Sequence, residues 1–426
     1  MNTLFPQDQT FWYLKKNGAP PLRHSIETDV VVIGGGMAGI TAAQAFSKKG
    51  KKVVLLEKNY CGAGASGKSS GFITPNSELA FADMERFFTR DIAERLWAAI
   101  SAGVATIKNN IDHYNLACDY VAQDTLVLAN SAHALKKLKK EHEDLSRLGY
   151  TTFYFDKAHV PQFVNSSAYC GGMGYGDSFG INSYLYCQEM KKVLSNLGIH
   201  IYEETPVLSI KNNTAQTDYA TVTAKHIIVC ADRFIPQFTD LSQQVYAMQT
   251  FILLSEVLQQ EQIAALFPNK QYMCWDTDLI YTYFRVTGTN RLIVGGGNMW
   301  TTYTTKEDHN YHAITKKLIN YVQKKFPNAH INFEYQWPGL IGISKDIMPI
   351  AGHDKENKHI YYAGAAAGLP ISAAIGAYSA DHIVDSRTDL DTCFSPYRSF
   401  PVGNFLQTFL GHKVSFALSN FIKLKW

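Results

Sequence analysis

The chain has 426 residues, of which 46% are hydrophobic and 18% charged, and it contains 24 Phe, 24 Tyr and 6 Trp. This composition excludes an intrinsically disordered protein, because such chains are poor in apolar residues. The net charge of +3 lacks the strong positive excess typical of nucleic-acid-binding proteins. At this length we expect two or three domains, or one nucleotide-binding domain that carries an inserted second domain.

The cysteine pattern predicts free thiols and no metal site. The seven cysteines are odd in number, and even the closest two, Cys170 and Cys187, do not form a Cys-x-x-Cys motif. The first 21 residues contain no apolar core of signal-peptide length. We therefore expect a cytoplasmic protein.

After a Pro-containing arm over residues 1–25, the pattern predicts a βαβ unit. Residues 29–33 form an apolar, β-branched run that leads directly into glycines, as a buried parallel strand does before a tight turn. Residues 40–48 have the pattern of a helix ending at Gly50, and residues 53–56 form a second apolar strand ending at Glu57.

Further elements follow in chain order. Helical apolar spacing is found at residues 82–115, 131–148, 182–197 and 309–326. Strands are expected at 200–202, 226–230 and 360–363, a hairpin at 206–222, and β-rich segments at 245–255 and 271–300. Residues 360–380 carry no charge, but their Gly and Pro content favours a strand, a loop and a buried helix over a membrane span.

These elements predict an α/β fold with a doubly wound, Rossmann-like nucleotide-binding domain built from discontinuous segments. Its pieces fall within residues 1–80, 171–238 and 335–426. The remaining segments, 81–170 and 239–334, predict an inserted β-rich α+β substrate domain.

The sequence Gly34-Gly35-Gly36-Met37-Ala38-Gly39 matches G-x-G-x-x-G between a strand and a helix, and Glu57 follows Gly34 by 23 residues. Gly34 permits the tight turn, Gly36 lets backbone amides approach a pyrophosphate, and Gly39 allows close packing of helix on strand. The Glu57 carboxylate is placed to accept hydrogen bonds from ribose hydroxyls. The motif predicts a bound dinucleotide and does not by itself distinguish NAD from FAD.

Three features favour FAD. A second small-residue loop, from Gly64 to Gly71, follows the ribose acid, and a single NAD would not need it. The strand at 360–363 leads into a glycine loop and a helix whose N-terminus can face the electron-rich edge of a flavin. No second complete fingerprint is present, since Gly295-Gly296-Gly297 lacks the third glycine and the following helix.

The chain resembles the FAD-dependent oxidoreductases related to D-amino acid oxidase, glycine oxidase and sarcosine oxidase (the DAO family), and within them the gamma-glutamylputrescine oxidase type. The resemblance rests on the Gly34 fingerprint, the Gly-Ala-Ser-Gly loop at 64–67 and several downstream motifs. These are Cys118-Asp119-Tyr120, Tyr283-Phe284-Arg285, Asn290-Arg291-Leu292, Gly295-Gly296-Gly297, Trp337-Pro338-Gly339, residues 346–349 and the strand, loop and helix from Ile360.

Two flavin loops depart from the pattern of this subgroup. Lys68-Ser69-Ser70-Gly71 stands where Arg-Asn-Gly-Gly is usual, and Gly364-Ala365-Ala366-Ala367-Gly368-Leu369 replaces Gly-Tyr-Ser-Gly-His-Gly. The first change alters a polar contact to the ring, and the second replaces a histidine near the flavin by an apolar residue.

The resemblance implies oxidation of an amine or amino acid. A neutral amine presents its alpha C–H to flavin N5, hydride passes to the flavin, water hydrolyses the imine, and oxygen reoxidises the cofactor. FAD is expected to be bound non-covalently. The candidate FAD-binding residues are Gly34, Gly36, Met37, Ala38, Gly39, Glu57, Lys58, Gly64, Ala65, Ser66, Gly67, Lys68, Ser69, Gly71, Val207, Ala231, Gly364, Gly368, Leu369 and Pro370, with Val207 at the adenine and Ala231 near the pyrophosphate.

The candidate catalytic residues are Lys68, Tyr283 and Arg285. Lys68, or the helix that starts near Pro370, would stabilise charge on the reduced ring. Strand alternation places Tyr281, Tyr283 and Arg285 on one face, where an Arg beside two Tyr could bind a carboxylate. An Arg paired with a structural acid fits the pattern equally well. Weaker candidates are Trp275, Trp337 and Lys345.

The C-terminal tail has basic but no acidic residues after Asp391. Its apolar residues could form one stripe: Phe405, Phe409, Leu410, Val414, Leu418, Phe421 and Ile422. A basic amphipathic helix can lie on a membrane, as a dehydrogenase that delivers electrons to quinone would require. We favour a helix that buries its stripe on its own domain. A protein that binds FAD structurally without catalysis is a third hypothesis, raised by the altered loops.

Overall fold

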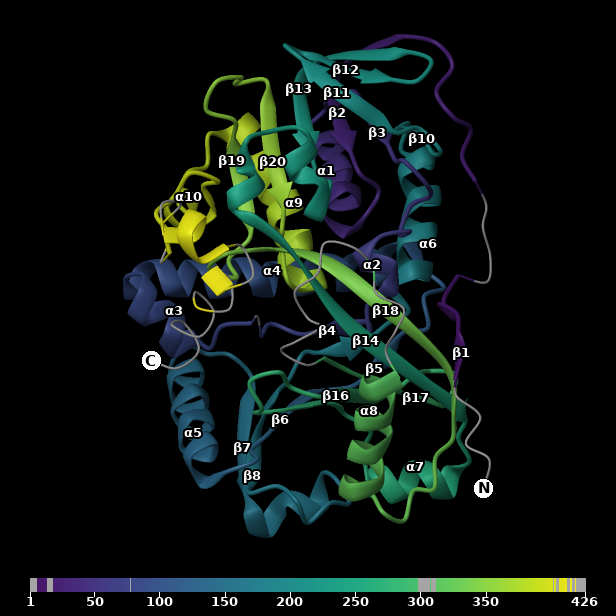
Figure 1. The fold of residues 1–426 in the computed structure, drawn as a ribbon, viewed down its shortest axis with the longest axis vertical. Helices are drawn as coiled ribbons and strands as arrows, with labels where there is room; N and C mark the ends of the chain where they lie inside the picture. The colour runs from purple at the N-terminus through teal and green to yellow at the C-terminus, as the bar shows by residue number, and fades with distance from the viewer. Residues whose placement is uncertain are drawn as a thin grey trace.

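The fold was analysed in a computed structural model that describes residues 6–13, 18–76, 78–297, 307, 312–400, 402–403, 406–411, 414–415 and 418. Two large sheets and one small sheet organise the chain (Figure 1). In that view the eight-stranded sheet lies at the top and the strands of the nine-stranded sheet reach the bottom, and the long strands β14 (Val245–Val257) and β18 (Phe333–Ser344) run between.

The eight-stranded sheet has a parallel centre, which confirms the predicted α/β fold. Five strands pair in parallel in the order β10 (His200–Tyr202), β3 (Val53–Leu56), β2 (Ile26–Ile33), β13 (Thr221–Val229) and β20 (Ile360–Gly364). The hairpin strands β12 (Thr214–Thr217) and β11 (Val207–Lys211), together with β19 (Ile350–His353), are antiparallel additions. The C-terminal ends of β2 and β13, and all of β3, are apolar and buried on both faces.

Helices cover one face of this sheet. Val30 and Val32 of β2 share a core with Met37 and Ile40 of α1 (Met37–Lys48) and with Ile375 of α9 (Leu369–Asp385). The same core contains residues of α6 (Ser183–Asn196) and of α4 (Arg90–Tyr114). The region 360–380 therefore contains a strand, a loop and a helix, as the sequence predicts. No helix in the described part of the chain is long and apolar enough to cross a membrane.

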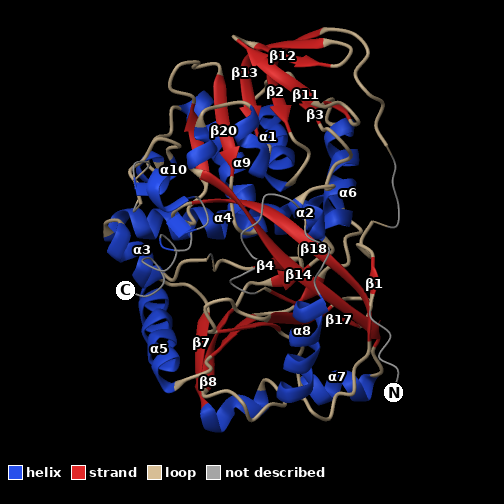
Figure 2. Ribbon diagram, viewed as in Figure 1, coloured by secondary structure: helices blue, strands red, loops and turns tan. Residues whose placement is uncertain are grey.

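The nine-stranded sheet joins segments from most of the chain. Its order is β1 (Gln7–Asp8), β18, β14, β17 (Arg291–Gly296), β16 (Tyr283–Val286), β15 (Met273–Asp276), β6 (Thr125–Leu128), β8 (Gly171–Tyr175) and β7 (Thr152–Asp156). β8 and β18 thus pair with strands of the predicted inserted domain. The helices α7 (Gln260–Leu266) and α8 (His312–Lys325) pack on one face of this sheet (Figure 2).

The third sheet has three short strands. Its strands are β4 (Phe72–Ile73), β9 (Phe179–Gly180) and β5 (Val121–Ala122).

Several predicted elements differ from the structure. The predicted helix at 82–115 is divided into α3 (Phe81–Phe87) and α4, because Phe88 and Thr89 are extended and the Thr89 side chain caps α4 by accepting from the Ile92 amide at 3.4 Å. The arm at 1–25 contributes β1 and the buried Trp12. The helix α5 (Ala132–Arg147) matches its prediction within one residue at each end, whereas the helices α7 and α10 (Asp391–Phe394) were not predicted. Residues 298–300 and 309–311 of predicted elements lie outside the described residues.

Several described residues of the predicted apolar stripe in the tail are exposed. Phe409 is 78% exposed and Val414 54% exposed, whereas Gln407 and Ser415 are buried. The expectation of a stripe packed on its own domain is therefore wrong for these residues, because the polar side of the segment faces the protein. Phe405, Phe421 and Ile422 lie outside the described residues.

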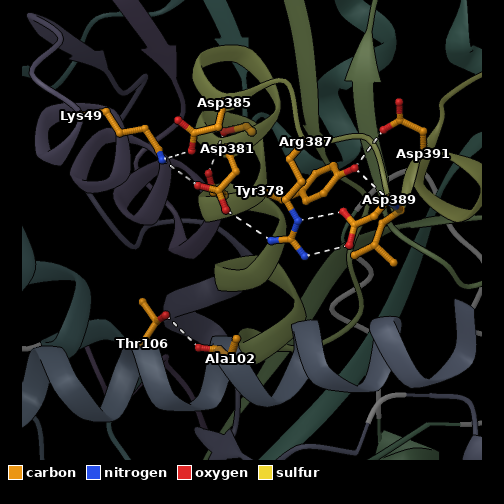
Figure 3. A network of polar contacts seen from close by, with 12 residues as sticks. Lys49, Ala102, Thr106, Tyr378, Asp381, Asp385, Arg387, Asp389 and Asp391 are labelled. Carbon is orange, nitrogen blue, oxygen red and sulfur yellow. Dashed lines mark hydrogen bonds and ion pairs between the residues drawn. The ribbon is translucent and has the colours of Figure 1, made fainter. Parts of the chain in front are cut away.

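The helices α1 and α9 cross closely at Gly376. A Cβ on Gly376 would lie 2.3 Å from the Ala38 carbonyl oxygen, so a larger residue would force the helices apart. Near the other end of α1, Lys49 pairs with Asp381 at 3.0 Å and with Asp385, and Arg387 bridges Asp381 and Asp389 (Figure 3). These ion pairs are partly solvated, so the apolar packing contributes more to the contact.

Replacement of Gly376 by Ala is expected to lower the free energy of unfolding by about 1–3 kcal/mol, despite the better helix propensity of Ala, because of overpacking against α1. Urea unfolding monitored by circular dichroism measures this change. The control Thr106→Ala alters an exposed side chain of α4 that bonds only the Ala102 carbonyl within its helix (Figure 3), and it should change stability by less than about 0.5 kcal/mol. Equal stability of the two variants would contradict the close crossing.

Candidate functional site

The register of three parallel strands brings the predicted glycine loops to one sheet edge. Ile33, Val229 and Tyr362 are aligned neighbours at the carboxyl ends of β2, β13 and β20. The residues that follow these ends are therefore adjacent. Gly34 directly follows β2, Ala231 lies two residues beyond β13, and Gly364 is the last residue of β20; all three are predicted cofactor ligands. In open α/β sheets this edge is where ligands bind.

The first glycine loop leaves no room for side chains. Gly34 has φ +111°, and a Cβ on it would lie 2.5 Å from the Cys230 carbonyl oxygen. A Cβ on Gly39 would lie 1.9 Å from the Gly34 carbonyl oxygen. The turn therefore requires glycine at both positions. The first amides of α1 have no intrahelical partners; the Met37 amide donates to the Ser66 hydroxyl, so the amides that follow it, beginning at Ala38, can bind an anion.

Glu57 lies beside this turn at the end of β3. Its carboxylate accepts from the Gly35 amide at 2.7 Å and from the Asn59 amide at 2.8 Å. Burial raises the pKa of Glu57, and the two amide donors oppose that shift. A carboxylate has about four acceptor positions, so it can still accept from ribose hydroxyls. The neighbouring Lys58 ammonium lies 3.4 Å from the centroid of the Phe234 ring.

The strand that starts with Val207 is tied to Glu57 through its preceding loop. The Thr205 amide donates to the Glu57 carbonyl at 2.9 Å. Val207 begins β11 two residues beyond this contact.

The second glycine loop is bound directly to the first. The Gly62 amide donates to the Gly35 carbonyl at 2.9 Å, and the Ser66 hydroxyl accepts from the Met37 amide at 3.0 Å. The short helix α2 (Ala65–Lys68) begins after Gly64, and a Cβ on Gly67 would lie 2.0 Å from the Gly62 carbonyl oxygen. The start of α1 and this loop thus form one continuous small-residue surface.

Two buried indoles hold the outer part of the second loop. Trp337 donates to the Lys68 carbonyl at 3.0 Å, and Trp12 donates to the Ser69 carbonyl at 3.2 Å. The Lys68 ammonium pairs with Glu307 at 2.5 Å. The Ser69 hydroxyl lies 3.0 Å from the Ser183 hydroxyl. Trp337 therefore stabilises the loop and need not contact a ligand. The role of Trp12 could not be predicted from the sequence, because its partner Ser69 is distant along the chain.

The third loop precedes α9. Gly368 has φ +117°, and Leu369 and Pro370, the first helical residues, are both buried. Gly103 of α4 packs against the Pro370 carbonyl, where a Cβ would lie only 2.1 Å away. The start of α9 is therefore fixed in place by α4.

Arg285 is a buried connector between the loops. It is 0% exposed, and it donates to the Ser70 carbonyl at 2.7 Å and to the Ile181 carbonyl at 2.6 Å. Burial lowers the pKa of Arg285 to about 10, and the charge of Asp119 opposes the shift. Gly71, with φ +74°, leaves space for this arrangement.

Four aromatic side chains, Phe72, Trp275, Tyr281 and Tyr283, form a group that we call the aromatic cluster. Consecutive ring centroids around the cluster are 5.8 to 6.4 Å apart. Phe72 directly follows the second glycine loop, and each of the four side chains keeps some exposure. The neighbouring Phe284 packs instead on Phe326, which confirms the predicted alternation along this strand.

Thr250 and Gly339 lie between Tyr283 of the cluster and the backbone of Lys68. Tyr283 shares a hydrogen bond with the Thr250 side chain. A Cβ on Gly339 would lie 3.7 Å from the Thr250 hydroxyl and 3.9 Å from the Lys68 carbonyl oxygen. Burial raises the pKa of Tyr283 to about 12, so this phenol stays protonated at neutral pH.

Some features lie apart from the glycine loops. Lys345 is buried and donates to the Val402 carbonyl at 3.3 Å. A surface pocket is formed by α4 and the small sheet, with Trp97, Tyr120 and Phe179 in its wall, and no residue from positions 34–39 or 62–71 lines it.

Known proteins resemble this chain over most of its length. Probable oxidoreductase OrdL of Haemophilus influenzae is 27% identical over 82% of this chain and 80% of its own length. Gamma-glutamylputrescine oxidoreductase of Escherichia coli is 26% identical over 91% of each chain. The crystal structure of glycine oxidase from Geobacillus kaustophilus, at 18% identity, superposes with a TM-score of 0.75 over 89% of this chain and all of that chain.

The family model described as DAO, FAD dependent oxidoreductase, matches residues 29–382. This span contains the three glycine loops, Glu57 and the aromatic cluster. The close approaches at Gly34 and Gly39, the amides at the start of α1 and the acid at the end of β3 fit a dinucleotide such as FAD. The chain therefore belongs to the DAO family of FAD-dependent oxidoreductases.

Proposed function

We propose that this oxidoreductase oxidises the carbon–nitrogen bond of an amine or amino acid. The observation that carries the proposal is the aromatic cluster beside the second glycine loop, where a substrate can lie between aromatic rings and the cofactor. Relatives named gamma-glutamylputrescine oxidoreductase and glycine oxidase support this substrate class.

In this proposal the three loops bind different parts of the cofactor. Amides at the start of α1 and Ala231 hold the pyrophosphate, Glu57 holds the adenosine ribose, and Val207 contacts the adenine. The second loop and the start of α9 hold the ring. When bound, FAD supplies the acceptor for the hydride from the carbon next to the substrate nitrogen.

Residues around the ring have distinct proposed roles. The Lys68 ammonium and the positive end of α9 stabilise negative charge at the ring edge. Tyr283 contacts the substrate. Arg285 is a positioning residue, because its guanidinium donates to the Ser70 and Ile181 carbonyls and fixes the second loop.

We also propose that the eight-stranded sheet with its helices forms the FAD-binding domain and that the nine-stranded sheet forms the substrate domain. Each is assembled from discontinuous segments, and the strands β8 and β18 are assigned to the substrate domain by their pairing.

A membrane-associated dehydrogenase that passes electrons to quinone is the second candidate. The observation that favours it is the exposure of Phe409 and Val414 in a tail without acidic residues. Exposed apolar side chains next to basic residues are typical of a helix that lies on an anionic membrane.

Anaerobic addition of a substrate amine is expected to bleach the flavin absorbance of the purified protein, because the flavin takes the two electrons of the C–H bond. The panel contains polyamines, gamma-glutamylated amines, N-methyl amino acids, and D- and L-amino acids. Recovery of the absorbance on admitting air indicates an oxidase, and slow recovery accelerated by a quinone indicates the dehydrogenase. A flavin that no member bleaches would contradict amine oxidation and favour a non-catalytic FAD-binding protein.

The variant Arg285→Lys is expected to lower the free energy of unfolding by about 2–4 kcal/mol, because Lys cannot bond both carbonyls in the interior. The affinity for FAD, measured by the fluorescence of released flavin, should fall about 10-fold as the second loop loosens. The control Arg291→Lys lies on the adjacent strand, where the guanidinium bonds the Ser255 carbonyl and the half-exposed Glu334. A variant with unchanged stability and FAD affinity, but a raised KM only for carboxylate substrates, would instead make Arg285 a substrate ligand.

A further inference from the structure

Glu78 is an acidic side chain at the edge of the aromatic cluster. The Tyr281 hydroxyl donates to its carboxylate at 2.8 Å, and Tyr281 is a member of the cluster. Glu78 precedes α3 and is only partly exposed. Burial raises the pKa of this carboxyl, and the hydrogen bond from Tyr281 opposes the shift.

The carboxylate has no cationic partner among the described residues. Of the two cations at the second loop, Lys68 pairs with Glu307, and Arg285 is directed through Nε and Nη2 to the Ser70 and Ile181 carbonyls. A carboxylate held in a mostly buried position without a counter-charge is costly, because desolvation is not compensated. A cation supplied by a ligand would remove this cost.

The surroundings of Glu78 suit an ammonium group. The faces of aromatic rings attract cations, and Trp and Tyr do so most strongly. Trp275, Tyr281 and Tyr283 supply such rings, and the carboxylate supplies a charge-assisted hydrogen bond. Gly295 permits the position of one ring, because a Cβ there would lie 2.1 Å from the Tyr283 ring. The absence of a side chain at Gly295 thus allows Tyr283 to face Phe72 and Tyr281.

We propose that Glu78 and the aromatic cluster bind a second, positively charged amino group of the substrate, so that the preferred substrates are diamines or other amines with a distant cation. This inference rests on the proposed amine oxidation. The reacting nitrogen is neutral and lies toward the flavin, while the ammonium at the other end of the substrate is held by Glu78. A substrate with a carboxylate at that end is repelled.

The test compares 1,4-diaminobutane with butylamine, which has the same carbon chain but lacks the second nitrogen. The wild-type holoenzyme is expected to have a kcat/KM for the diamine about 10- to 100-fold above that for the monoamine. The variant Glu78→Gln keeps the size and an acceptor for Tyr281 but loses the charge, and it should lower this ratio by about the same factor. The control Glu85→Gln on α3, whose carboxylate lies 3.5 Å from the exposed Arg90, should retain the wild-type ratio.

Binding of a dication that cannot be oxidised gives a readout independent of turnover. The bis-trimethylammonium derivative of butane, titrated into the holoenzyme by calorimetry, should bind about 10-fold more weakly to Glu78→Gln than to wild type. Equal binding, or a variant that lowers the rates of diamine and monoamine by the same factor, would overturn the proposal. An enzyme that oxidises amino acids but neither amine, and that binds no dication, would overturn it, while the proposed oxidation of a carbon–nitrogen bond would stand. A flavin that no amine or amino acid reduces would reject the proposed function instead.

Discussion

The parallel register of β2, β13 and β20 is the constraint on which the site depends. Backbone pairing of Ile33 with Val229, and of Val229 with Tyr362, fixes where three distant segments of chain end. Because the C-terminal ends of β2 and β13, and all of β20, are buried on both faces, a shift in register would disturb the packing on both sides of the sheet. The same pairing that stabilises the core therefore sets the relative positions of the three glycine loops.

Interactions from outside this sheet then hold the second loop. Trp12, Trp337 and Arg285 all donate to carbonyls of residues 68–70. Each comes from, or packs against, the nine-stranded sheet, so the loop that we assign to the flavin ring is supported mainly by the sheet that carries the aromatic cluster. A buried guanidinium is costly to desolvate, and its hydrogen bonds offset that cost only while the loop keeps this conformation. The loop geometry and the candidate substrate site are consequently coupled.

Local patterns allowed much of the site to be predicted. Gly34, Gly36 and Gly39 could be recognised because the turn, the strand and the helix are adjacent in sequence, and Glu57 because it ends the next strand. Glu78 could not be recognised, because its partner Tyr281 is 203 residues away and a lone acid before a helix has no distinctive pattern. For Arg285 the strand alternation was predictable, but its contacts with Ser70 and Ile181 depend on tertiary structure. The exposed Phe409 shows the same limit, since an apolar stripe does not reveal which side of a segment faces the protein.

The most direct test of this account is a crystal structure of the protein with FAD bound. The account predicts the pyrophosphate at the start of α1, the ribose at Glu57, and the flavin ring between residues 64–71 and the start of α9, with the aromatic cluster facing the substrate side of the ring. A flavin ring positioned away from the second loop would contradict the account. So would protein atoms that separate the ring from the aromatic cluster, because one substrate could then not contact both.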